Sequence, residues 1–150
     1  MVENFGLDYS TKEWVYHSTG EGDGDFVYLY ETMIRDLSVI VPFDKYEADV
    51  LQILGVAPTQ LHPNGWAAMQ AFRVVCHCLR IKPAASLFLY HYTTCIDVKA
   101  SWVSLSPLSK TNLFNTYLAF YKGFKNHLVK VRALGGTFFA EDKKPMPLYW

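Results

Sequence analysis

The stretch LHPNGWAAMQAFRVVCHCL, from Leu61 to Leu79, constrains the fold of this chain more than any other. Asn64 follows a proline, and its side chain is of a type that caps the first turn of a helix. From Trp66 onward, nearly every residue is apolar or small. The spacing therefore predicts a helix over residues 64–81.

The polar residues of this helix recur every three or four positions and form one narrow stripe. They are Gln70, Arg73, His77 and Arg80. A helix that is apolar except for one stripe is packed on most sides. We therefore expect a central helix whose buried residues include Trp66, Met69, Phe72 and Cys76.

Three further helices are predicted around it. Apolar residues at helical spacing predict a helix over residues 26–37, and a shorter one is expected over 84–93. The helix that follows Asp44 has the clearest local signals, because Asp44 and Glu47 have the spacing of a capping box. Gly55 provides the left-handed residue at its end.

Strand signals concentrate towards the end of the chain. Residues 128–133 alternate at strand period, and 101–105 and 137–140 are shorter candidates. Residues 146–150 would add a strand that stops at Trp150, which indicates a truncated sequence. The expected fold is α+β and mainly α: about four helices around the central helix, followed by a small C-terminal antiparallel sheet.

Composition indicates one globular domain, since the chain has 150 residues, of which 51% are hydrophobic and 16% aromatic. We expect residues 1–24 to be an acidic, Gly-rich flexible arm and residues 25–150 to be that domain. Charge is divided unevenly: residues 1–50 hold eleven acidic and three basic side chains, and 51–140 hold one acidic and nine basic. Such a division favours a charged partner or self-association, or else neutralisation within the fold.

Catalytic and metal sites are not expected. Cys76 and Cys78 would project from different sides of a helix, and His91 with Cys95 provides two ligands where zinc needs four. Nucleophile and phosphate-loop motifs are missing from the sequence. Three cysteines cannot all pair, which favours thiols and an intracellular location, cytoplasmic or nuclear. No cofactor, small-molecule substrate or membrane span is predicted.

The basic segment 99–132 is the main functional signal. Its candidate contact residues are Lys110, Lys122, Lys125, Lys130 and Arg132. Aromatic residues lie among them, and this combination suits a single-stranded nucleic acid. The aromatic residues could equally belong to the core.

Four motifs together resemble a known family: APTQLHPNGW, SWVSL, YKGFKNHLVKVRA and PLYW. They resemble a gypsy-type retrotransposon domain that recurs in plant genomes, and the resemblance covers roughly residues 25–150. In that family a glycine often lies near position 80, where this chain has Arg80. The resemblance implies a mobile-element origin and a structural, gag-like role.

The sequence therefore predicts a non-enzymatic structural or protein-interaction module derived from a plant retroelement. Its expected partner is a second copy of the chain. The alternative is a nucleic-acid-binding domain that holds RNA or DNA through the basic segment.

Overall fold

The computed structural model of the chain describes residues 5–10, 26–97, 102–110, 113–114, 123–134 and 138–143. These residues form four α-helices, two short 3₁₀ helices and five strands. In chain order they are β1 (Phe5–Ser10), β2 (Phe26–Tyr30), α1 (Glu31–Arg35), α2 (Lys45–Leu54), η1 (Pro58–Gln60), α3 (Pro63–Cys78), α4 (Ala85–Leu89), β3 (Tyr92–Asp97), β4 (Trp102–Pro107), η2 (Phe124–Asn126) and β5 (Leu128–Ala133).

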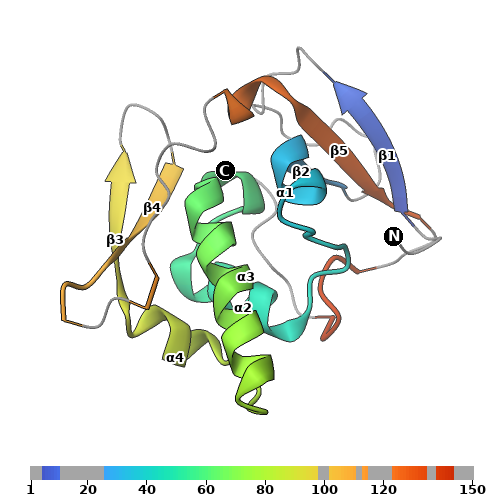
Figure 1. Ribbon diagram of the computed structural model, residues 1–150. Coiled ribbons are helices and arrows are strands. Elements are labelled where there is room, and N and C mark those ends of the chain that lie inside the picture. Colours follow the sequence, from blue (N-terminus) through green and yellow to red (C-terminus); the bar gives the residue numbers. More distant parts are fainter. Residues whose placement is uncertain are drawn as a thin grey trace.

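The strands form two antiparallel sheets on either side of the helices. β5 lies between β1 and β2, and β3 pairs with β4 in a separate hairpin. Figure 1 shows α2 and α3 at the centre, with the three-stranded sheet on one side and the hairpin on the other. One apolar core joins both sheets to the helices, and Trp66 and Phe43 pack in it with their rings 5.7 Å apart.

The class α+β is correct, but the predicted mainly-α architecture with its sheet at the C-terminal end is wrong. The N-terminal strands β1 and β2 flank β5, so this sheet joins both ends of the described chain. The second sheet follows α4 directly. The pairing of strands about 100 residues apart leaves no local pattern, because the hydrogen-bonding partners are distant in sequence.

The first predicted helix, over residues 26–37, begins as a strand. Phe26–Tyr30 is β2, and α1 occupies only Glu31–Arg35 of the remainder. Aromatic and β-branched residues favour a pleated, half-buried surface, and here Val27 and Leu29 are fully buried on one face of the sheet. The same five residues also fit a helical face, so pairing with β5 decides between the two conformations.

The predicted helix over residues 84–93 is likewise shorter, since α4 ends at Leu89 and Tyr92–Asp97 forms β3. The strands predicted at residues 101–105 and 128–133 are confirmed as β4 and β5, with Ser101 outside the described residues.

In the third predicted strand, at residues 137–140, Ala140 forms an isolated parallel bridge with Phe43. Residue 137 and the predicted strand at residues 146–150 lie outside the described residues.

The predicted arm over residues 1–24 contains an ordered element. Phe5–Ser10 is β1, paired with β5 along its whole length, and the Phe5 side chain is buried. These six residues of the predicted arm therefore belong to the three-stranded sheet. Residues 1–4 and 11–24 lie outside the described residues.

The central helix is confirmed at α3, with all four predicted buried residues in the core: Trp66, Met69, Phe72 and Cys76. Its N-cap is His62 and not Asn64, because Pro63 already begins the helix. Pro63 suits the first helical position because that residue needs no amide hydrogen there.

The expectation that α3 is packed on most sides is wrong for its last turns. Val74 is 61% exposed and Leu79 is 64% exposed. The first half of the polar stripe instead faces α2, where Gln70 and Arg73 contact Glu47, whereas His77 and Arg80 are exposed. A buried carboxylate needs polar partners, so this part of α3 is placed with its polar residues against α2.

Candidate functional site

The predicted basic contact residues occupy several different environments. Lys110 is exposed after β4, and Lys125 is exposed in η2. Lys130 lies on β5 and is buried, with Nζ 4.2 Å from the centroid of the Phe26 ring. Arg132 is exposed two residues further along β5. Lys130 is therefore part of the sheet's packing and not a free surface cation.

Lys122 lies outside the described residues.

The uneven charge is partly neutralised inside the fold. Arg73, from the basic part of the chain, places Nη2 2.8 Å from Asp44 Oδ2 and 2.9 Å from Glu47 Oε1. The alternative of internal neutralisation is thus supported at these contacts.

Three of the four motifs meet at one place, which we call the motif junction: His62, Trp102, Phe124 and Lys125. The His62 ring lies 5.3 Å from the Trp102 ring and 5.1 Å from the Phe124 ring, both edge-on. Lys125 Nζ lies 3.8 Å above the Trp102 ring. A cation at that distance is attracted by the negative face of the ring. The junction therefore combines an exposed cation with a half-exposed aromatic platform.

Backbone contacts hold the motif junction together. His62 N donates to Val103 O at 2.9 Å, which joins the start of α3 to β4. Gly65 leaves room for the buried Leu61 side chain, because a Cβ there would lie 2.9 Å from it. Trp66 Nε1 donates to Pro58 O at 3.1 Å, which fixes η1 against α3. Much of the QLHPNGW motif is thereby explained as the joint between the hairpin and the central helix.

The His62 side chain has a definite protonation state in this arrangement. Its Nδ1 accepts from Asn64 N at 3.1 Å, and a nitrogen that accepts carries no proton. Burial, with a smaller contribution from the charge of Lys125, lowers the pKa of His62 below its usual value. The imidazole is thus neutral near neutral pH and acts as the helix cap.

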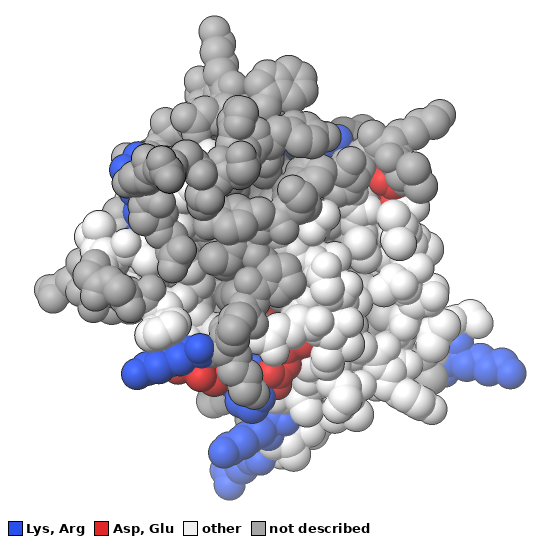
Figure 2. Space-filling view, turned by 180° about the vertical axis from the view of Figure 1, so that it is seen from behind, with Lys and Arg blue, Asp and Glu red and all other residues white. Residues whose placement is uncertain are grey.

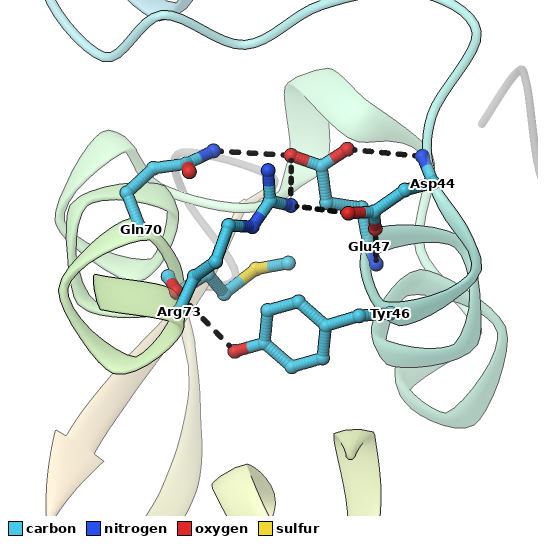
Figure 3. Close-up of polar contacts among 6 residues, drawn as sticks. Asp44, Tyr46, Glu47, Gln70 and Arg73 are labelled. Atoms are coloured by element: carbon cyan, nitrogen blue, oxygen red, sulfur yellow. Dashed lines mark hydrogen bonds and ion pairs between the residues drawn. The ribbon is translucent and has the colours of Figure 1, made fainter. Parts of the chain in front are cut away.

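Glu47 forms a second polar cluster between α2 and α3 (Figure 3). Glu47 Oε2 accepts from Asp44 N at 3.2 Å, which completes the predicted capping box. Gln70 Nε2 donates to Glu47 Oε1 at 3.0 Å, and Arg73 Nη2 approaches the same oxygen. The Tyr46 hydroxyl donates to the Met69 carbonyl at 3.4 Å. Glu47 Oε1 thus holds α2 and α3 together, and Oε2 caps the start of α2.

The environment of Glu47 disfavours its charge. The side chain is nearly inaccessible, at 2% exposure, and burial raises the pKa of Glu47 above its usual value although Arg73 opposes the shift. The sequence contained both halves of this cluster, the capping box and the polar stripe. The sequence did not show that Gln70 and Arg73 of α3 face Glu47 on α2.

The cysteines lie apart from one another. Cys76 is buried in α3, whereas Cys78 and Cys95 are exposed. In the part of the chain that the structure describes, no three histidine, cysteine or acidic side chains gather as metal ligands. None of the helices among the described residues is long and apolar enough to cross a membrane.

About half of the chain matches a known protein family. Residues 26–96 match a gypsy-type transposon family, described as "Putative gypsy type transposon". The match runs from β2 to β3 and contains the QLHPNGW motif and the whole of α3. It confirms the association with gypsy-type transposons that the motifs indicate. No curated protein and no solved structure matches the chain.

Proposed function

We propose that this chain carries a non-enzymatic protein-interaction module of a gypsy-type transposon, which associates through an uncharged surface. The observation that carries the proposal is a surface on the hairpin side of the molecule with almost no acidic or basic side chains (Figure 2). Large exposed apolar side chains also occur along the chain from the end of α3 to the end of the hairpin, a stretch that includes the exposed charges Arg80, Lys82 and Asp97. Between residues 74 and 108 they are Val74, Val75, Leu79, Ile81, Leu87, Tyr90, Ile96 and Leu108.

Exposed apolar side chains in such number favour a contact surface. Contiguous exposed apolar patches on soluble proteins mark interaction sites when they exceed a few hundred Å². Their burial against a partner is driven by the hydrophobic effect, which does not depend on opposite charge. A gag-like assembly role is consistent with a contact of this kind.

The two polar groups with the most distinctive environments support a non-enzymatic role. Glu47 closes the capping box of α2, and His62 caps α3. Side chains with a shifted pKa often mark catalytic sites, but structural hydrogen-bond and ion-pair networks shift pKa values as well. Here each perturbed group already has a structural function.

Light scattering coupled to size exclusion tests the proposal over a range of protein concentrations. We expect association that grows with concentration and persists from about 0.1 M to about 1 M salt, because apolar contacts are not screened. Association that disappears at high salt would instead indicate head-to-tail attraction between charged patches. A monomer at every concentration would refute the interaction module.

Nucleic-acid binding is the second candidate, favoured by the Lys125–Trp102 pair at the motif junction. Stacking of bases on aromatic rings beside a cation is a common mode of single-strand binding. Fluorescence anisotropy with single-stranded RNA tests it. Lys125→Glu should abolish binding, whereas Lys110→Glu, the same charge reversal at another exposed site, should have a smaller effect. Equal effects would indicate non-specific attraction.

A further inference from the structure

Strand β3 forms the outer rim of the hairpin (Figure 1). Its one pairing partner among the described elements is β4. Five of its six residues are exposed, and Ile96 is 71% exposed. An edge strand of this kind presents unpaired backbone groups to any strand that approaches it.

The hydrogen-bonding pattern shows which backbone groups face outward. Leu108 N donates to His91 O at 3.0 Å, so the backbone of His91 faces β4. Successive residues of an antiparallel strand alternate in direction, so Thr93, Cys95 and Asp97 also face β4. The amide and carbonyl groups of Tyr92, Thr94 and Ile96 therefore face away from the hairpin.

The sequence of β3 does little to protect this edge. Natural edge strands are usually guarded by lysine, proline or inward-pointing charge, whereas β3 reads YTTCID and has a single charge, at its last residue. A two-stranded sheet is also marginal by itself and gains stability from further strands. The hairpin is thus well suited to extension by a third strand.

We propose that β3 pairs antiparallel with β3 of a second copy and forms a four-stranded sheet across a two-fold axis. This proposal rests on the proposed function as an interaction module, and it identifies the partner of that module as a second copy of the chain. Because the outward groups belong to residues 92, 94 and 96, the centred register places Thr94 opposite Thr94 of the second copy. Tyr92 then lies opposite Ile96, and His91 opposite Asp97.

The Thr94–Thr94 and Tyr92–Ile96 pairs are favourable across a sheet. Threonine pairs, aromatic with β-branched pairs, and pairs of opposite charge all stabilise antiparallel strands. Asp97 of one copy would meet the end near Lys110, an exposed cation two residues beyond Leu108. The two-fold axis thus places Asp97 of each copy near Lys110 of the other, which favours a second copy over an unrelated strand.

Two substitutions on the edge test the proposal. Thr94→Pro removes an outward amide hydrogen but leaves the amides that face β4, and Ile96→Lys introduces the charge that edges normally carry. Each should weaken dimerisation measured by light scattering about tenfold or more. Ile53→Lys is the matched control, because Ile53 is 61% exposed on α2 and lies outside the apolar stretch proposed as the contact surface. Val74→Lys tests the part of that stretch that lies on α3. Circular dichroism and thermal melting verify folding of each variant.

Cross-linking through Cys95 gives an independent readout. In the centred register, the Cys95 residues of the two copies are diagonal neighbours, with Cα atoms about 7–8 Å apart, within reach of a short bismaleimide. With Cys78→Ser removing the other exposed thiol, the cross-linked dimer should form and should disappear in Thr94→Pro.

The outcomes separate this inference from the proposed function. Association that resists both edge variants but is lost in Val74→Lys would overturn the β3 contact and leave the interaction module standing. A dimer that does not cross-link through Cys95 would also overturn it. A chain that stays monomeric at all concentrations would refute both.

Discussion

Arg80 occupies a position at the end of α3 that favours glycine. Ile81 N donates to Cys76 O and Arg80 N donates to His77 O, each at 3.0 Å, which is the Schellman pattern. This pattern requires a left-handed residue, and Arg80 has φ 57°. α2 ends in the same way, but there Gly55 takes the left-handed position with φ 66°.

The expected gain from Arg80→Gly follows from two opposing contributions. A left-handed conformation costs a non-glycine residue about 1–2 kcal/mol. Replacement by glycine removes this strain, but it also makes the unfolded chain more flexible, which offsets about 0.4–1 kcal/mol of the gain. Because Arg80 is exposed, the substitution removes few packing contacts. The free energy of unfolding should therefore rise by about 0.5–1 kcal/mol, and Tm by about 1–4 °C.

Urea unfolding followed by circular dichroism measures this change. The control is Gly55→Ala, because a Cβ at Gly55 would meet nothing within 4 Å and its cost is conformational alone. It should lower the free energy of unfolding by about 1 kcal/mol. If Gly55→Ala behaves in this way and Arg80→Gly gives no gain or a loss, the reasoning about the end of α3 is wrong.

Three further predictions concern the core and the two polar caps. Phe72→Ala should cost about 3–5 kcal/mol in urea unfolding, since Phe72 is buried in the core; a loss under about 1 kcal/mol would contradict its central position. Stability should decrease as pH falls below about 6.5, because the pKa of His62 is lower in the folded than in the unfolded chain and protonation removes the cap. Melting curves across this range should show the slope, and His62→Asn should flatten it if the assignment is correct. Arg73→Leu should cost about 2–4 kcal/mol at about pH 7 by leaving Glu47 buried without a cation, and less at about pH 5, where the raised pKa of Glu47 lets it take up a proton. Equal losses in urea unfolding at the two pH values would argue against this account.

The candidate site was partly accessible from the sequence. The motifs that carry the family resemblance identified His62, Trp102, Phe124 and Lys125 as members of distinctive segments. Their meeting at one junction could not be predicted, because side-chain contacts between distant segments leave no periodic signal. The basic segment was predicted as one functional unit, yet Lys130 is packed under Phe26 while Lys125 is exposed beside Trp102.

Local signals in the sequence determined the ends of α2 and the buried face of α3. The capping box and the left-handed Gly55 lie within one helix, so their geometry depends on neighbours a few residues away. The helical spacing of Trp66, Met69 and Phe72 likewise identified one face as buried, and all three are in the core.

Tertiary structure decided which ambiguous segments became strands. Phe26–Tyr30 fits a helical face as well as a strand, and it becomes β2 because Val27 and Leu29 pair with Val131 and Val129 of β5 about 100 residues later. The direction of Gln70 and Arg73 on α3 was decided in the same way, by a buried carboxylate on α2 that needs polar partners. A local pattern restricts the conformations available to a segment, and the burial and hydrogen bonds offered by distant segments select among them.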